Sequence, residues 1–217
     1  MFNTWENIRK TAPLIHHITN YVTVNDVANI TLACGASPVM ADDAEEAAEI
    51  TQIASGLCLN IGTLNQRTIP AMLSAARRSG ELNHPVILDP VGAGATHLRT
   101  QTALNILQTG SVTCVRGNIS EIKTLIHGTG NTKGVDAAAV DSVTEENLAA
   151  SCEFAKQTAH KLNTIVAITG ATSSTTSISS FTTLIYIFFF TFLIWLHFIF
   201  ISTTNNFFQI NIFFTKI

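Results

Sequence analysis

The feature that most constrains the fold is an alternation of short apolar runs with longer amphipathic stretches, which continues up to Gly170. Such alternation is typical of βαβ units, whose right-handed crossovers stack helices on both faces of one parallel sheet. The sequence therefore predicts an α/β fold. Strands are predicted at 14–18, 37–40, 57–61, 86–89, 112–116 and 164–169, and helices at 1–11, 24–34, 42–55, 66–78, 97–107, 119–126 and 145–161.

Composition changes abruptly at Gly170. All 12 glycines, all 5 prolines and all 15 acidic residues lie at or before this position, whereas 11 of the 13 phenylalanines follow it. We therefore predict two parts, a folded α/β part at 1–170 and a tail of another kind at 171–217. Within the tail, residues 181–201 carry no charge, and this length is about the ~20 residues that span a bilayer.

Three interpretations of the tail are open. A membrane anchor at 181–201 is the first, although Lys216 is the only basic residue beyond it and gives little orientation signal. A buried terminal element is the second, but continuous Phe and Ile fit neither an amphipathic helix nor a half-exposed strand. The third, which we favour, is translated non-coding or frame-shifted sequence, because AT-rich codons favour the residue types found here.

Net charge and cysteine spacing narrow the range of possible partners and cellular compartments. The net charge is −3, with no basic run, so no nucleic-acid-binding surface is expected and a small-molecule partner is favoured. The four cysteines are widely spaced without a C-x-x-C pair, which indicates a reducing, cytoplasmic compartment. The N-terminal stretch lacks the apolar run of a signal peptide.

A candidate site begins where the apolar run at 86–88 ends in Asp89, followed by Pro90, Gly92 and Gly94. Ligands of open parallel sheets bind beyond the carboxyl ends of the strands, where glycines allow backbone N–H groups to approach an anion. Asp89 is then expected to face a phosphate or its metal. The alternative is that Asp89 caps the next helix and the glycines only make a turn.

Three more predicted strand ends carry polar or unusual residues. Amides and hydroxyls cluster at 16–29, where Asn25 lies, and capping of the next helix is the alternative explanation. Met40 ends the second predicted strand, where a methionine is more often core filler than a ligand contact.

The remaining strand end is that of the run at 112–116. Asn118 and Glu121 are three residues apart at the start of a predicted helix, so both side chains lie on one helix face. An amide and a carboxylate there could hold water around Mg²⁺, which keeps most of its hydration shell in proteins. Arg116 precedes this turn and could reach a phosphate.

Six segments together resemble one family. I-T-N-Y-V-T-V-N-D-V-A-N, G-A-S-P-V-M, L-N-I-G-T-L, L-D-P-V-G-A-G-A, V-R-G-N-I-S-E-I and V-A-I-T-G occur in that order and resemble hydroxyethylthiazole kinases, over residues 5–170. The resemblance implies a ribokinase-like parallel sheet with helices on both faces, here incomplete at the C-terminus and followed by a hydrophobic tail. It also implies transfer of the γ-phosphoryl of ATP, with Mg²⁺, to the alcohol of 4-methyl-5-(2-hydroxyethyl)thiazole in thiamine salvage. Family members are trimers with active sites between subunits.

The resemblance also implies roles for single residues. Met40 and Asn25 correspond to the thiazole site, and Arg116 and Thr169 to the ATP contacts. The metal and its water correspond to Asp89, Asn118 and Glu121. These roles agree with phosphoryl transfer, which needs positioning and charge neutralisation more than covalent chemistry.

The chain departs from the family after V-A-I-T-G. The resemblance implies a strand hairpin and then a G-T-G-C loop that opens a helix, and neither is recognisable after Gly170. We therefore assign no catalytic residue. The alternative function is a non-catalytic kinase remnant or a weak thiazole-binding module, attached to a membrane only if residues 181–201 act as an anchor.

Overall fold

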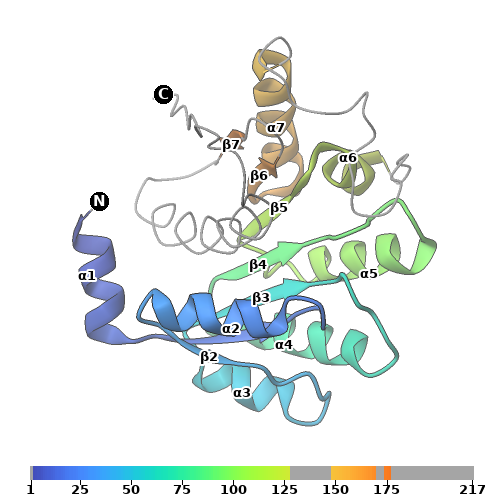
Figure 1. The fold of residues 1–217 in the computed structure, drawn as a ribbon. Coiled ribbons are helices and arrows are strands. Elements are labelled where there is room, and N and C mark those ends of the chain that lie inside the picture. The colour runs from blue at the N-terminus through green and yellow to red at the C-terminus, as the bar shows by residue number, and fades with distance from the viewer. Residues whose placement is uncertain (1, 128–147, 170–173, 177–217) are drawn as a thin grey trace, which may run out of the picture.

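The structure is a computed structural model that describes residues 2–127, 148–169 and 174–176, and it is built on one sheet (Figure 1). The strand order is β2-β1-β3-β4-β5-β6-β7, in which neighbours up to β6 are parallel and β7 is antiparallel to β6. The strands are β1 (Leu14–Ile18), β2 (Ser37–Val39), β3 (Gly56–Asn60), β4 (Val86–Asp89), β5 (Cys114–Asn118), β6 (Ile165–Thr169) and β7 (Ser174–Thr176).

Helices cover both faces of this sheet. They are α1 (Phe2–Thr11), α2 (Val24–Ala33), α3 (Ala47–Ile53), α4 (Thr68–Leu82), α5 (His97–Leu107), α6 (Ile119–His127) and α7 (Leu148–Leu162). Successive side chains of a strand point to opposite faces, and two neighbours in β1 show which helix lies where. His16 hydrogen-bonds Thr51 of α3 at 2.8 Å, whereas His17 contacts Thr31 of α2 at 3.3 Å. Accordingly, α2 and α3 pack on opposite faces.

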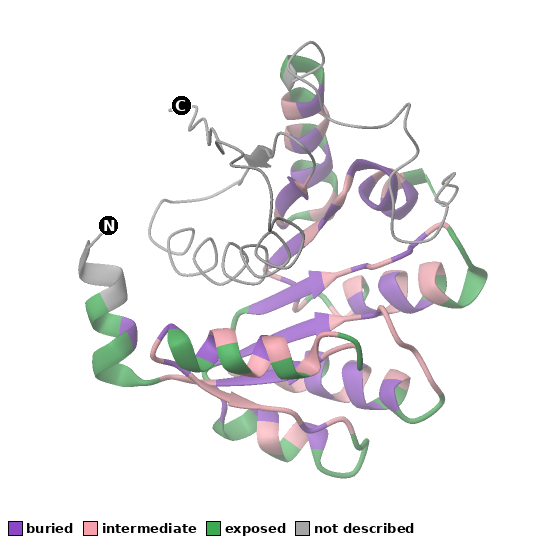
Figure 2. Cartoon of the chain, in the orientation of Figure 1, coloured by how far each residue is buried: buried purple, intermediate pink, exposed green. Residues whose placement is uncertain are grey.

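Strands β1 and β3 to β6 are mostly buried, whereas β2 is half-buried (Figure 2). The larger apolar core includes Leu57, Leu59 and Leu88 of the sheet and buried residues of α3 to α7, such as Met72 of α4. A smaller cluster on the other face joins Ile8 of α1 to alternate strand residues that include Cys58, Ile87 and Cys114. Burial of both faces explains why the strands read as continuous apolar runs.

The predicted ribokinase-like α/β architecture is confirmed. The strand bounds 14–18 and 86–89 are as predicted, and the other four predicted strands are present with ends displaced by one or two residues. The predicted helix at 42–55 starts only at Ala47. Asp43 explains this difference, because its carboxylate accepts the Glu45 N–H at 2.9 Å and holds a turn before the helix.

Beyond Gly170, β7 is a feature that the sequence analysis did not predict. Residues 174–176 pair with β6 in antiparallel register, so the expectation that no strand hairpin follows V-A-I-T-G was wrong. No helix within the described ranges is long and apolar enough to cross a membrane. The proposed anchor at 181–201 and the start of the predicted helix at 145–161 lie outside the described residues.

Candidate active site

The carboxyl ends of the parallel strands gather the polar residues at one edge of the sheet. Asp89 ends β4 and is the register partner of Asn60, which ends β3. Asn118 ends β5 and is the register partner of Thr169, which ends β6. The residues expected to serve the nucleotide and metal therefore lie side by side on neighbouring strands.

Asp89 and Arg116 form an ion pair at this edge. Arg116 Nη1 donates to Asp89 Oδ2 at 2.9 Å, and the side chains of Arg116 and Asp89 are only 17% and 14% exposed. Burial raises the pKa of Asp89, while the Arg116 guanidinium and the amide of Asn60 lower it again. Asp89 Oδ1 accepts no hydrogen bond from the described residues, so one carboxylate oxygen is open to an external ligand.

Asn118 and Glu121 bond to each other at the start of α6. Asn118 Oδ1 accepts the Glu121 N–H at 2.9 Å, and Glu121 Oε2 accepts the Asn118 N–H at 2.8 Å, which makes a reciprocal capping box. Glu121 is 4% exposed, and its pKa is raised to about 7 by burial first and by the charge of Asp89 second. This carboxyl can therefore exchange a proton near neutral pH.

The glycine loop after β4 is held from inside the chain. Gly92 donates its N–H to Glu121 Oε1 at 2.8 Å, and Gly94 donates to Thr100 Oγ1 at 2.9 Å. These two amides therefore have internal acceptors, which agrees with the alternative that the glycines make a turn. Gly92 is required for geometry, since its φ is +73° and an added Cβ would lie 2.4 Å from Arg99 Nη1.

The other end of the same edge contains the predicted thiazole residues. Met40 follows β2 and is half-buried, and Asn25 is exposed in the first turn of α2. Both side chains are thus partly accessible in a single chain, as a site between subunits requires. The strands β1 and β3 separate β2 from Asp89, so these residues belong to a part of the edge distinct from the ion pair.

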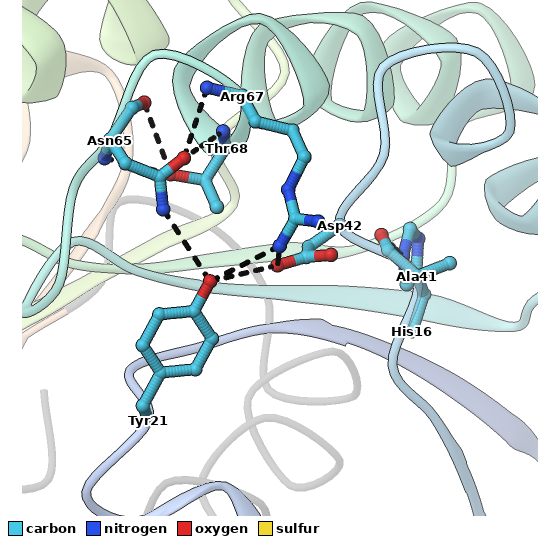
Figure 3. Close-up of polar contacts among 7 residues, drawn as sticks. All are labelled: His16, Tyr21, Ala41, Asp42, Asn65, Arg67 and Thr68. Atoms are coloured by element: carbon cyan, nitrogen blue, oxygen red, sulfur yellow. Dashed lines mark hydrogen bonds and ion pairs between the residues drawn. The ribbon is translucent and has the colours of Figure 1, made fainter.

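A surface network near this second end was not predicted from the sequence (Figure 3). Arg67 Nη2 contacts Asp42 Oδ2 at 3.0 Å and the Tyr21 hydroxyl at 3.2 Å, and Asn65 donates to the same hydroxyl at 3.4 Å. The loops that follow β1, β2 and β3 are thereby joined to one another. Tyr21 is 54% exposed, so this network lies at the surface.

Beneath this surface network, His16 fixes the backbone beside Met40. Its Nε2 lies 2.8 Å from the carbonyl oxygen of Ala41, and both residues are drawn in Figure 3. Its Nδ1 lies 2.8 Å from Thr51 Oγ1. Burial lowers the pKa of His16, and burial together with the His16 charge lowers the pKa of His17 to about 3. Both histidines are therefore neutral at pH 7, with structural hydrogen bonds.

The carboxylates fit a hydrated Mg²⁺ better than a metal held by several protein ligands. Among the described residues, no group of three or more His, Cys, Asp or Glu side chains could hold a metal ion. Mg²⁺ is usually bound through one or two carboxylates and keeps several waters. Asp89 Oδ1 accepts no hydrogen bond from the described residues and matches this donor set, and each oxygen of Glu121 keeps a lone pair beside its backbone N–H bond.

Comparison with known proteins identifies the family of the chain. The sequence model of the Hydroxyethylthiazole kinase family matches residues 5–185. The chain belongs to this family. The match includes all the candidate site residues described above and extends past Gly170.

Curated members of the hydroxyethylthiazole kinase family are closely similar over most of the chain. A hydroxyethylthiazole kinase of Clostridium acetobutylicum is 59% identical over 166 residues, which are 76% of this chain and 61% of the relative. One from Clostridium beijerinckii is 54% identical, over 76% of this chain and 59% of its own length. The chain thus spans about 60% of the length of these relatives.

A solved structure of the family has the same fold. The hydroxyethylthiazole kinase protein from Pyrococcus horikoshii OT3 matches with a TM-score of 0.69 and 37% sequence identity. The match covers 80% of this chain and 62% of that chain. The family therefore accounts for the parallel sheet on which the two ends of the site are built.

The structure adds residues that sequence reasoning left without a role. Asn20 and Asn60 form a line of hydrogen bonds toward Asp89, with Asn20 Nδ2 to Asn60 Oδ1 and Asn60 Nδ2 to Asp89 Oδ2 both at 3.1 Å. Both asparagines lie in the quoted segments I-T-N-Y and L-N-I-G-T-L. Their positions at or just beyond strand ends are the signal by which the sequence could have indicated a role for them.

Proposed function

We propose that the chain serves the ATP- and Mg²⁺-dependent phosphorylation of the hydroxyethyl group of 4-methyl-5-(2-hydroxyethyl)thiazole, in thiamine salvage. Membership of the family supports the reaction class. The observation that carries the proposal is the buried Asp89–Arg116 ion pair with Glu121 beside it. A buried cation next to two carboxylates is the charge arrangement that a metal-bound phosphate requires.

At the nucleotide end, each residue has a separate task. Arg116 neutralises phosphate charge, and Thr169, half-buried at the end of β6, offers a hydroxyl to the nucleotide. Asp89, Asn118 and Glu121 would hold Mg²⁺ and its water, and the ion would neutralise the charge on the transferring phosphoryl group. Without a metal, burial raises the pKa of Glu121 to about 7, and a bound Mg²⁺ would lower it again and favour the carboxylate.

At the substrate end, Met40 and Asn25 are proposed to contact the thiazole alcohol. The accessible position of both residues supports a site that another subunit completes, and we propose a homotrimer on the pattern of the family. Gel filtration with light scattering tests this proposal, because a monomer at all concentrations would contradict it. Cys34, Cys58 and Cys114 are buried free thiols, which supports a cytoplasmic location.

A second candidate function is supported by a sequence observation. The family resemblance implies a G-T-G-C segment that holds the transferring phosphate, and residues 5–185, which match the family, contain none. Loss of a single oxyanion donor costs about 10² to 10³ in rate in a well-studied protease. The chain by itself would then bind both ligands and turn over slowly, as a remnant or a thiazole-binding module.

One experiment separates these candidates. The purified chain is titrated with ADP and Mg²⁺ and with the thiazole alcohol by calorimetry, and thiazole-dependent ADP release from ATP is followed in parallel. We expect both ligands to bind, with turnover at least 100-fold below the ordinary enzyme range of about 1 to 10³ per second. Turnover within that range would refute the remnant interpretation, and absence of nucleotide binding would refute the proposed function.

The matched variants for this experiment are Arg116→Ala and Arg78→Ala. Arg116 lies in the proposed site, whereas Arg78 forms an exposed pair with Glu81 on α4. We expect the first change alone to weaken ADP binding. Equal losses in both variants would show that the nucleotide binds elsewhere.

A further inference from the structure

A line of polar side chains crosses the carboxyl edge of the sheet and joins its two ends. Its members are Asn20 after β1, Asn60 at the end of β3, Asp89 at the end of β4 and Arg116 in β5. Three contacts connect them, at 3.1, 3.1 and 2.9 Å. Asn60 lies inside this line, between Asn20 and Asp89.

The chemistry of this position requires an amide. Asn60 Oδ1 accepts hydrogen bonds from Asn20 Nδ2 and from the Gly62 N–H, whereas Asn60 Nδ2 donates to Asp89 Oδ2. An ionised carboxylate can only accept, so Asp89 fixes the orientation of the amide. Only a short side chain with an acceptor on one branch and a donor on the other satisfies both neighbours.

On one side, the line leads to the start of α2. Asn20 Oδ1 accepts the N–H of Val22 at 3.1 Å, the N–H of Thr23 at 3.0 Å and the Thr23 hydroxyl at 3.1 Å. Asn20 therefore sets the path of the loop that leads into α2 and to Asn25. This is the end of the site proposed to meet the thiazole alcohol.

On the other side, the line leads to the ion pair. Asp89 Oδ2 accepts from both Asn60 Nδ2 and Arg116 Nη1, so these two donors together leave Oδ1 as the open oxygen. The register of the sheet places Asn60 and Asp89 opposite each other. Gly62 provides the necessary space, because a Cβ there would lie 2.9 Å from Asn60 Oδ1 and 3.2 Å from Asn20 Cβ.

We propose that Asn60 is a positioning residue that joins the loop after β1 to the Asp89–Arg116 pair and thereby couples the two ends of the site. The inference rests on the proposed function for the identity of the two ligands. When the thiazole alcohol binds, it orders the loop that contains Asn20. Asn20 then fixes the amide of Asn60, and Asn60 keeps the Asp89 carboxylate in the orientation that the nucleotide needs. Coupling of this kind is reciprocal, so each ligand strengthens the binding of the other by the same factor.

The first test measures that factor in the full chain. The Kd of ADP with Mg²⁺ is measured by calorimetry with and without saturating 4-methyl-5-(2-hydroxyethyl)thiazole, and the reverse titration is also performed. We expect the unaltered chain to show a mutual gain of about 5-fold or more, which is typical of coupled sites. In Asn60→Leu we expect the gain to fall to about 1-fold, because leucine fills similar space and makes neither hydrogen bond.

Two control variants separate coupling from a general loss of structure. Asn105→Leu makes the same exchange on α5, where Asn105 bonds only Gln101 among the described residues. Ile106→Val removes one methyl group from the buried core and lowers stability without contact to the polar line. Both are expected to keep the full mutual gain. A mutual gain that persists in Asn60→Leu, or that is lost equally in the controls, would overturn the inference.

The second test needs no ligand. Among the described side chains, Asn60 alone hydrogen-bonds both Asn20 and Asp89, so we expect the shifts in urea midpoint of Asn20→Ala and Asp89→Asn to be non-additive. In the background of Asn60→Leu the same two shifts are expected to add. If Asn60→Leu does not fold, Asn60→Ser replaces it, because the shorter hydroxyl cannot reach both neighbours.

The two tests also keep the inference separate from the proposed function. If the unaltered chain binds neither ligand, the proposed function fails. The double-mutant cycle measured by urea denaturation then decides alone whether Asn60 joins the two ends. Additive shifts in the unaltered background would overturn the inference even if both ligands bind. Non-additive shifts together with a mutual gain that disappears in Asn60→Leu are the result that we expect.

Discussion

Two arginine–aspartate ion pairs of nearly equal length lie at the same edge of the sheet. Arg116–Asp89 measures 2.9 Å and Arg67–Asp42 measures 3.0 Å. The first pair has side chains 17% and 14% exposed, whereas the second has side chains 55% and 33% exposed. The two ion pairs therefore contribute differently to stability. Water screens the exposed Arg67–Asp42 pair, called the outer pair, and is largely excluded from the Arg116–Asp89 pair, called the inner pair.

This difference indicates how the site is divided. The end that we propose for the nucleotide is already organised within one chain, with its charges paired and its carboxyls desolvated. The end that we propose for the thiazole alcohol consists of loops that are tied together at the surface, with Met40 and Asn25 accessible. A preorganised end suits the charged phosphoryl group, and an open end suits a substrate that a second surface must enclose.

The largest effect is expected from Arg116→Ala. Removal of the guanidinium leaves the Asp89 carboxylate buried without its cation, which costs about 3 kcal/mol of unfolding free energy, the lower end of the range for buried pairs. Urea denaturation measures this loss. Asp89→Asn in the same background is expected to recover part of the stability, because the uncompensated charge is then absent. If Arg116→Ala lost no more stability than Arg67→Ala, the buried pair would contribute no more to folding than the exposed pair.

The second effect is a pH dependence centred on Glu121. Its ordinary pKa of 4.5 rises to about 7 in the folded protein, so between these values the folded state binds a proton that the unfolded state releases. Its stabilising contribution is therefore complete below pH 4.5 and is lost as the pH rises through about 7. The loss amounts to at most about 3 kcal/mol, from the linkage between pKa and stability.

The measurement is the difference in unfolding free energy between the unaltered chain and Glu121→Gln, taken across this pH range without Mg²⁺. Only the difference isolates Glu121, because His16 and His17 are neutral when buried and destabilise the fold as the pH falls below 6.5. We expect the unaltered chain to lose stability relative to Glu121→Gln as the pH rises. Parallel curves would show that the Glu121 carboxyl is not desolvated.

The fold could be predicted from the sequence because one local pattern determines it. Runs such as Val86-Ile87-Leu88 must be buried on both faces, and this is possible only in a parallel sheet covered by helices. The start of α3 was missed because a single side chain, Asp43, competes with the helix for backbone hydrogen bonds. The strand β7 was missed because Ser and Thr lack the apolar signal of the other strands.

The site could be predicted only as far as strand ends allow. Parallel strands align their carboxyl ends, which is why Asp89, Arg116 and Asn118 could be expected at one edge. The partner of each side chain depends on strand order and register, which local sequence does not contain. For this reason the sequence analysis gave Asn60 no role and did not identify Glu121 as the acceptor of the Gly92 amide.

A third prediction concerns the glycine loop that supports the inner pair. In Gly92→Ala the φ of +73° and the close approach of Arg99 together are expected to cost about 2 kcal/mol, from a left-handed backbone with a side chain added. The matched control is Gly110→Ala, with a φ of +72° and no atom within 4 Å of the added Cβ. Thermal unfolding of both variants separates contact from conformation, and equal losses would show that Arg99 moves away without cost.

The smallest effect is expected from Arg67→Ala, which removes the outer pair. Arg67 is more than half exposed, so the screened charge contributes little and the thermal midpoint is expected to change by no more than the measurement error. Its hydrogen bond to Tyr21 orders the loop after β1, and its loss should appear instead as faster amide hydrogen exchange at residues 20–24. Raising the salt concentration should reproduce part of this exchange in the unaltered chain, because at about 1 M salt the Debye length falls to about 3 Å, close to the length of this exposed pair. If high salt destabilised the Asp89 end as strongly as this loop, water would reach both pairs alike, and the contrast between a preorganised end and an open end would be lost.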